Sequence, residues 1–231
     1  ANTTGDGNVA MGYQALKSNT TADDNVAIGD QALEFNTTGG QNIAIGSFAL
    51  QDSTTGNYNV AVGYLANENN TTGSSNVAIG RAALNENSTG GANIAIGRSA
   101  LLSNTTANNN TAVGYTALTS NTTGSENTAV GSLTLDGNTI GGENTAVGYS
   151  ALGSNVSGDR STAMGYNALG AQNNGTSSYD ADNTAFGFHA AVSITTGLRN
   201  IAIGSSALGA ADADGRNVAI GYSALSNMNT A

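Results

Sequence analysis

Apolar and polar residues alternate over short stretches of this chain, and the stretches recur at a fixed distance. Between Asn25 and Gly29 the sequence Asn-Val-Ala-Ile-Gly places Val26 and Ile28 on one face and Ala27 on the other, which is the period of a β-strand. β-Branched residues are frequent and a glycine ends each stretch, so no segment is long enough for a stable helix. The pattern predicts a series of short strands separated by turns.

A glycine follows each of these stretches, and thirteen such glycines recur with a spacing of 17 positions, except for one interval of 22. A fixed short period is typical of units that stack on their neighbours because none can bury its own apolar face. It predicts an all-β fold, a parallel β-solenoid of thirteen coils with this 17-position repeat, in a single repeat domain covering 1–231. The anchor glycines are Gly12, Gly29, Gly46, Gly63, Gly80, Gly97, Gly114, Gly131, Gly148, Gly165, Gly187, Gly204 and Gly221.

The longer interval marks a five-residue insertion within 171–182. It separates the coils anchored on Gly12 to Gly165 from those anchored on Gly187 to Gly221. Insertions in repeat proteins form surface loops and often lie on a binding face. Here we favour a tolerated bulge at one corner of the coil.

The residues of the repeat form columns that run through all coils. The consensus is Asn-x-Ala-Ile/Val-Gly-Tyr-x-Ala-Leu-x-x-Asn-Thr-Thr-Gly-x-x. The apolar residue before the anchor glycine and the leucine four residues after it are predicted to form the core. The glycine after Asn-Thr-Thr is predicted to form a corner, because glycine adopts left-handed backbone angles without steric cost. The opening asparagine is replaced only at Ser161, and such a stack of amides is predicted to hydrogen-bond from coil to coil.

An alanine stands two residues before the anchor glycine in every copy. Because this column accepts only a methyl group, we hypothesise that it faces either a narrow interior or a seam between chains, and that Ala112→Leu disrupts assembly. The candidate assembly residues are Ala10, Ala27, Ala44, Ala61, Ala78, Ala95, Ala112, Ala129, Ala146, Ala163, Ala185, Ala202 and Ala219.

The column directly after the anchor glycine is variable and rich in tyrosine, which indicates exposure. Tyrosine has an apolar ring with a polar end, so it suits stacking on sugars, contact with a partner chain, or packing between neighbouring coils. The candidate surface-binding residues are Tyr13, Tyr64, Tyr115, Tyr149, Tyr166 and Tyr222, together with Tyr179 in the insertion.

Threonine forms a further column, which could order water or ice, although turn chemistry is the favoured role because these residues precede a corner. Its members are Thr21, Thr38, Thr55, Thr72, Thr89, Thr106 and Thr123. The Asn-Thr-Thr triplets also match the N-glycosylation sequon, a weak signal when it lies inside a repeat. The matching asparagines are Asn19, Asn36, Asn70, Asn104 and Asn121.

The composition excludes several classes of function. The net charge is −10, and the six basic residues form no cluster in sequence, so binding to nucleic acid or to anionic lipid is not expected. No apolar stretch is long enough to span a membrane. With one histidine, no cysteine and no repeating carboxylate pair, we expect no enzyme, no cofactor and no metal site. Asp212-Ala-Asp214-Gly215 lacks the dense ligand spacing of a calcium loop.

Four segments carry a resemblance to known surface fibres: Asn25 to Gly29, Asn76 to Gly80, Asn110 to Leu118 and Asn144 to Leu152. They resemble the head repeats of YadA-like trimeric autotransporter adhesins, and equally the repeats of phage tail fibres and related bacterial surface fibres. The resemblance implies a left-handed parallel β-roll, three chains side by side, and attachment to a host surface or matrix. The adhesin repeat is shorter than the repeat of this chain, so no functional residue is transferred individually.

These observations favour an extracellular, non-enzymatic fibre segment for adhesion, at a cell surface or on a virion. The expected partners are further copies of the chain, as a homotrimer or an end-to-end polymer, and a host-surface glycan or matrix protein. The alternatives are a self-assembling structural filament joined end to end and, less favoured, ice binding through the threonine column.

Overall fold

The computed structural model describes residues 2–173, 175, 179–210 and 215–227. Within these residues the chain is all-β, and its strands are joined by tight turns without a helix. The chain divides into two compact units, residues 1–110 (the first unit) and 111–231 (the second unit).

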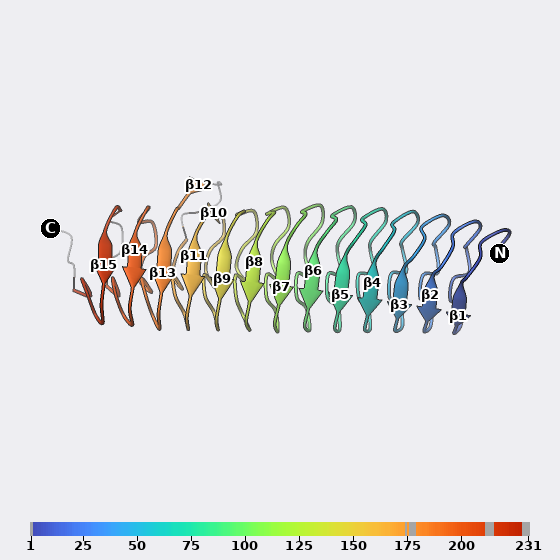
Figure 1. Ribbon diagram of the computed structural model, residues 1–231, viewed down its shortest axis with the longest axis horizontal. Coiled ribbons are helices and arrows are strands. Elements are labelled where there is room, and N and C mark those ends of the chain that lie inside the picture. The colour runs from blue at the N-terminus through green and yellow to red at the C-terminus, as the bar shows by residue number, and fades with distance from the viewer. Residues whose placement is uncertain (1, 174, 176–178, 211–214, 228–231) are drawn as a thin grey trace. The chain divides into compact units, whose positions relative to one another are not determined.

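The first unit is a parallel β-solenoid. Its strands are β1 (Val9–Met11), β2 (Val26–Ile28), β3 (Ile43–Ile45), β4 (Val60–Val62), β5 (Val77–Ile79) and β6 (Ile94–Ile96). They pair in chain order, and each residue lies beside the residue 17 positions later, as Ala27 lies beside Ala44 (Figure 1). The predicted parallel solenoid, with its 17-position repeat, is therefore confirmed.

The second unit continues the same pattern. Its main sheet contains β7 (Thr111–Val113), β8 (Thr128–Val130), β9 (Thr145–Val147), β11 (Thr162–Met164), β13 (Thr184–Phe186), β14 (Ile201–Ile203) and β15 (Val218–Ile220). The insertion adds a small second sheet, in which β10 (Gly158–Asp159) pairs with β12 (Tyr179–Asp180) in parallel. The main register is kept across it, since Thr162 pairs with Thr184.

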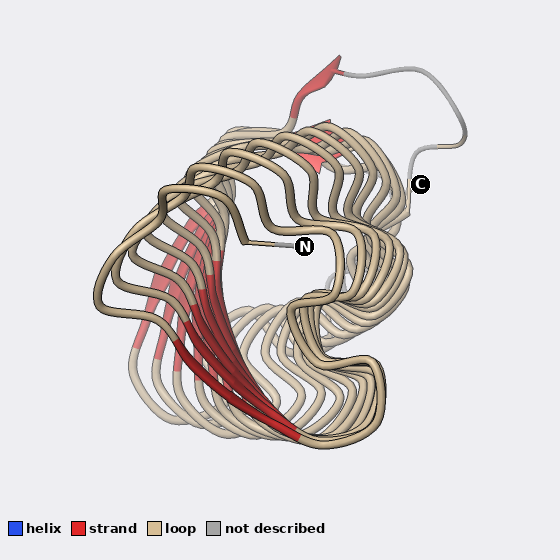
Figure 2. Cartoon of the chain, turned by 90° about the vertical axis from the view of Figure 1, so that its right-hand side faces the viewer, coloured by secondary structure: helices blue, strands red, loops and turns tan. Residues whose placement is uncertain are grey.

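The interior of each coil is narrow, and the strands lie on one side of it (Figure 2). The middle alanine of each strand points inward and is buried, as at Ala27 and Ala112; Ala10 in β1 is exposed. The leucine column is also buried, as at Leu33 and Leu118, so this part of the predicted core is confirmed.

The prediction that the apolar residue before the anchor glycine belongs to the core is wrong. Ile45 is 38% exposed and Met11 is 63% exposed. The reason is the alternation of the strand: because the alanine points inward, the residues on both sides of it point outward. The same geometry places the alanine column in the narrow interior, one of its two predicted locations, because twelve of these residues are buried within the chain.

Two ladders of buried asparagine amides connect the coils. In the opening column, Nδ2 of Asn42 donates to Oδ1 of Asn25 at 3.1 Å and to the carbonyl oxygen of Gly56 at 2.9 Å, as the sequence predicts. A second ladder runs through the Asn-Thr-Thr triplets, where Nδ2 of Asn36 donates to Oδ1 of Asn19 at 3.2 Å. Because the sequon asparagines are buried, the folded chain cannot accept a glycan on them.

The corners use left-handed backbone angles at residues other than the predicted glycines. In each coil the second and fourth residues after the anchor glycine have positive φ, as at Gln31 (56°) and Leu33 (51°). The corner glycine has no such angle. It is required by space, since a Cβ on Gly39 would lie 2.3 Å from the carbonyl oxygen of Gly56 in the next coil. The prediction was right about the corner and wrong about its cause.

Candidate functional site

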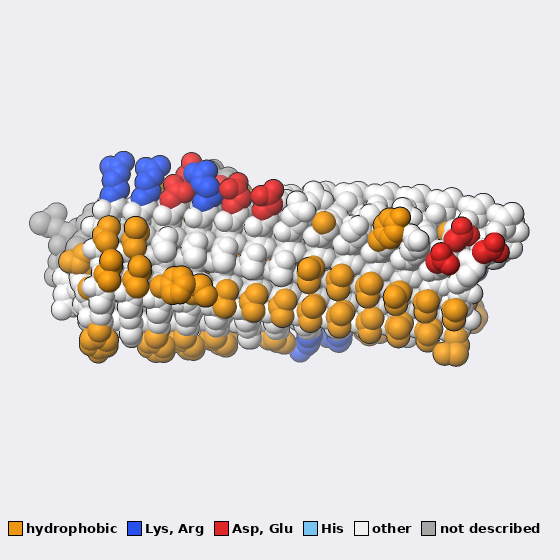
Figure 3. Space-filling model, in the orientation of Figure 1, with side chains coloured by type: hydrophobic (Ala, Val, Ile, Leu, Met, Phe, Trp, Pro, Cys, Tyr) orange, Lys and Arg blue, Asp and Glu red, His pale blue; other side chains and the backbone are white. Residues whose placement is uncertain are grey.

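The outer face of the sheet in the first unit carries two rows of apolar side chains, which are exposed or half-buried. On every strand from β1 to β6 the first and third residues are valine, isoleucine or methionine, and they flank the inward alanine. Figure 3 shows these rows in orange, side by side. Contiguous exposed apolar surface on a soluble protein marks contact with another molecule. We call this surface the outer sheet face.

The corresponding face of the sheet in the second unit is more polar. Strands β7, β8, β9, β11 and β13 begin with threonine and end with an apolar residue, whereas β14 and β15 are apolar at both positions. The register aligns Thr111, Thr128 and Thr145 on adjacent strands. A row of hydroxyl and methyl groups therefore runs beside a single apolar row.

The candidate tyrosines divide into one column and one separate residue. Tyr13, Tyr64, Tyr115, Tyr149, Tyr166 and Tyr222 all follow an anchor glycine and are exposed, from 46% at Tyr64 to 84% at Tyr222. Tyr179 lies on β12, outside this column, and is partly buried. Six of the seven candidates therefore hold the same exposed position in their coils, two of them in the first unit and four in the second.

Aromatic rings of this column stack on one another in the second unit. The ring centroids of Tyr149 and Tyr166 are 5.3 Å apart with an interplanar angle of 9°, and those of Tyr166 and Phe188 are 5.3 Å apart at 17°. Tyr149, Tyr166 and Phe188 nevertheless remain 47–53% exposed. The tyrosines therefore pack between coils and stay accessible at the same time.

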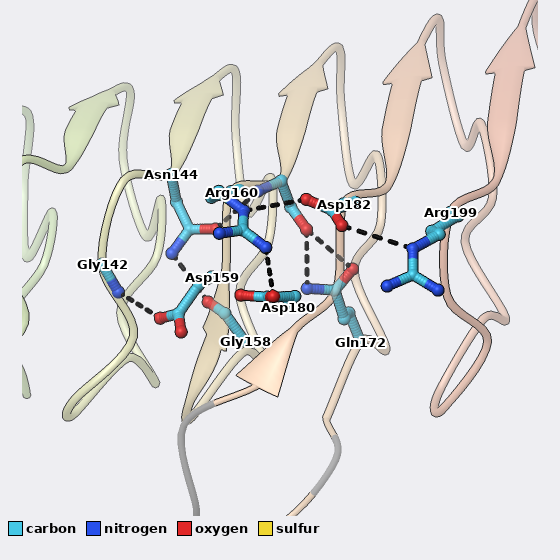
Figure 4. Close-up of polar contacts among 10 residues, drawn as sticks. Gly142, Asn144, Gly158, Asp159, Arg160, Gln172, Asp180, Asp182 and Arg199 are labelled. Atoms are coloured by element: carbon cyan, nitrogen blue, oxygen red, sulfur yellow. Dashed lines mark hydrogen bonds and ion pairs between the residues drawn. The ribbon is translucent and has the colours of Figure 1, made fainter.

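Charged side chains fasten the insertion to the corner of the coil (Figure 4). Arg160 forms ion pairs with Asp180 on β12 and with Asp182, whose Oδ1 lies 2.9 Å from its Nε. Arg199 lies 3.5 Å from the other oxygen of Asp182. The hydrogen bond from Arg160 lowers the pKa of Asp182, and the charges of both arginines add to this effect against the opposing effect of burial. The arrangement is that of a structural clamp.

Gln172 links the two amide ladders at the coil where Ser161 replaces the opening asparagine. Its Nε2 donates to Oδ1 of Asn155 at 3.2 Å and to Oγ of Ser161 at 3.1 Å, while its Oε1 accepts from Nδ2 of Asn183 at 2.9 Å. The longer side chain thus reaches across the coil from one ladder to the other. It satisfies groups left by the serine that replaces the opening asparagine, a coupling that the sequence analysis missed.

A buried carboxylate in the first unit is held by hydrogen bonds. Glu34 is 3% exposed; Gln31 donates to its Oε2 at 2.8 Å, Gln51 donates to the same oxygen at 3.1 Å, and Lys17 lies 3.1 Å from its Oε1. Burial alone would raise the pKa of Glu34, but these hydrogen bonds outweigh it, so the pKa lies below the usual value of 4.5. The contacts of Glu34, like those of Arg160, therefore have a structural role.

The two threonines of each Asn-Thr-Thr triplet have different surroundings. The first serves the turn, since Oγ1 of Thr20 donates to the carbonyl oxygen of Thr37 at 3.0 Å in the next coil. The second, which belongs to the predicted threonine column, is exposed, as at Thr21 and Thr38. The column is therefore at the surface but at a corner, away from the strands.

The described part of the chain shows neither a cluster of metal-binding side chains nor a membrane-spanning helix. No three carboxylate or histidine side chains there come close enough to hold a metal ion. Asp212 and Asp214 lie outside the described residues. The same residues contain no helix of the length and apolarity needed to cross a membrane.

No protein-family model, curated protein or solved structure matches the chain. The fold defines its class as a parallel β-solenoid repeat protein. The surfaces available for function are the outer sheet face and the aromatic column, by which we mean the exposed aromatic residues that directly follow an anchor glycine. The first could have been recognised in the sequence, because an inward alanine places both of its neighbours outside.

Proposed function

We propose that the chain is a non-enzymatic segment of an extracellular fibre, which assembles as a homotrimer and serves attachment to a cell surface or from a virion. The observation that carries this proposal is the outer sheet face, where every strand of the first unit has two outward apolar side chains, exposed on β1, β3 and β6 and half-buried on β2 and β4. The resemblance of the repeats to YadA-like heads and tail fibres supports the attachment role and the number of chains.

A second copy of the chain is well suited to cover the outer sheet face. Parallel sheets are ordinarily buried on both faces, and here no described strand of the first unit covers the outer face. Every copy presents the same rows at the same strand spacing, so identical chains placed side by side match row to row. Association would remove the isoleucine and valine side chains from water, which is the main favourable contribution to such an interface.

Charged substitutions on the outer sheet face test the assembly. Ile45→Lys with Ile79→Lys places two ammonium groups in an apolar row, and we expect this variant to be monomeric by light scattering. The matched control, Thr38→Lys with Thr72→Lys, adds the same charge at the exposed corner and should remain trimeric. A trimer in both variants, or a monomeric wild type, would overturn the proposal. Indefinite fibres under the electron microscope would favour an end-to-end filament instead.

Ice binding is a second candidate, supported by the threonine row on β7, β8 and β9. Flat strands hold these side chains in a regular array, about 4.8 Å apart along the sheet, in contrast to the threonines at the corner. Thermal hysteresis of the purified protein tests this role. Thr128→Lys with Thr145→Lys should abolish any hysteresis, and its absence in the wild type at high concentration would remove the candidate.

A further inference from the structure

In the second unit, the column directly after the anchor glycine has an aromatic residue at five positions and a serine at two. In coil order its residues are Tyr115, Ser132, Tyr149, Tyr166, Phe188, Ser205 and Tyr222. Backbone hydrogen bonds fix this order, since the amide of Asn167 donates to the carbonyl of Tyr149 and that of His189 to the carbonyl of Tyr166, each at 2.9 Å.

The rings of Tyr149, Tyr166 and Phe188 form a slipped stack that follows the order of the coils. The rings are nearly parallel, and each ring centroid lies 5.3 Å from the next. The ring of His189 lies 4.0 Å from Phe188 and also 5.4 Å from Tyr166. If His189 lay on the side of Phe188 that is turned away from Tyr166, it would be much farther than 5.4 Å from Tyr166. The side of Phe188 toward Ser205 is therefore not covered by His189.

The serines leave a gap of one coil at each end of this stack. Ser132 is the column position next to Tyr149, and Tyr115 is the position after it; Ser205 is the position next to Phe188, and Tyr222 is the position after it. Each gap spans two coil steps, or about twice the 5.3 Å step between stacked rings. One further ring in the gap would lie about 5 Å from each neighbour, within the range that stacked rings prefer.

We propose that each gap binds one neutral pyranose ring of a glycan, so that the sugar continues the stack. A pyranose has apolar C–H faces and a rim of hydroxyl groups. Each gap has aromatic residues at the column positions on both sides of a serine, and each of these aromatic side chains is at least 47% exposed, which matches both features. A phenyl side chain would stack on these aromatic residues but would leave its edge against water.

A neutral sugar is favoured because the columns on either side of each gap carry no charge. Val130 and Leu133 flank Ser132, and Ile203 and Ser206 flank Ser205. Single stacking sites of this kind bind weakly, with individual dissociation constants on the order of millimolar. Two gaps on one chain, repeated on each copy of a trimer, would bind a polymer far more tightly than a single sugar. The inference rests on the proposed attachment function and names its ligand class.

Filling the gaps tests the proposal, with dextran, mannan and galactan as neutral probes and hyaluronan as an acidic one. Ser132→Tyr with Ser205→Tyr completes the stack, so we expect at least a tenfold loss of polymer binding together with a higher melting temperature. Tyr166→Phe keeps the stack and should bind as wild type. The rise in melting temperature shows that a loss of binding is not a loss of fold.

The inference would be overturned by wild type that binds none of the neutral polymers, by gap-filled variants that bind as wild type, or by preferential binding of hyaluronan. Binding of a phenylalanine-rich peptide in place of the sugars would also overturn it. Light scattering on the same samples separates this inference from the proposed function. A trimeric wild type without sugar binding contradicts only the inference, whereas a monomeric wild type contradicts the proposed assembly.

Discussion

Asn67 occupies a position that is leucine in most coils, and replacing it with leucine should stabilise the protein. The side chain is fully buried, and neither its Oδ1 nor its Nδ2 has a hydrogen-bond partner in the described part of the chain. The coils before and after place Leu50 and Leu84 at the same position, both fully buried. Asn67→Leu therefore removes an unsatisfied amide and continues a column of leucines.

The expected gain in the free energy of unfolding follows from three contributions. Relief of a buried polar group without a partner contributes about 1–3 kcal/mol. Burial of the leucine side chain adds about 1.5 kcal/mol. Against this, φ at residue 67 is +50°, which asparagine tolerates better than leucine by about 1 kcal/mol. Neighbouring leucines already adopt this angle, at 51° and 54°, so the backbone accommodates it. The net stabilisation should be about 2 kcal/mol.

Urea unfolding followed by far-ultraviolet circular dichroism is the assay, with an expected rise in the midpoint of about 0.5–1 M. Because coils of a solenoid interact chiefly with their neighbours, amide hydrogen exchange should slow most in the coils that contain Leu50 and Leu84. The reciprocal variant Leu84→Asn should lower the midpoint. A lower midpoint for Asn67→Leu would refute the reasoning, since it would mean that the interior at this coil is shaped for the amide.

Three further predictions concern the interior and its polar contacts. Ala112→Leu should lower the melting temperature by several degrees, because overpacking costs about 1–3 kcal/mol inside a coil that accepts only a methyl group; an unchanged value would contradict the narrow interior. Gln172→Ala should destabilise the fold by about 1–3 kcal/mol. In a double-mutant cycle with Ser161→Ala the effects should depart from additivity by at least about 0.5 kcal/mol, and strict additivity would argue against the bridge. The lowered pKa of Glu34 means that its contribution to stability is present above pH 4.5 and is lost as the pH falls through the folded value. The urea midpoints of wild type and Glu34→Gln should therefore converge in acid, and a constant difference would disprove the assignment.

The sequence was sufficient to predict the solenoid, its register, the leucine column and the first amide ladder. These features are repeated in nearly every coil, so one alignment reveals them. The apolar column before the anchor glycine was misplaced because hydrophobicity alone suggests burial. In a coil this thin, only the alanine methyl fits inside the sheet, and Ile45 and its equivalents are left on the surface.

The features that the sequence did not reveal depend on contacts between coils. Tyr166 and Phe188 both follow an anchor glycine, so the sequence aligns their positions, but it does not show that their rings stack across the insertion. Gln172 compensates Ser161 because its side chain is one methylene longer than asparagine, a relation visible only when both ladders are seen together. The corner glycines were identified correctly, but their dependence on space is a property of the next coil.

Sedimentation equilibrium of the wild-type chain over a wide range of concentrations tests the central proposal most directly. If the outer sheet face joins identical chains, the mass should be three times that of one chain and should persist on dilution. A mass equal to one chain at every concentration would show that the exposed apolar rows do not join copies of this protein.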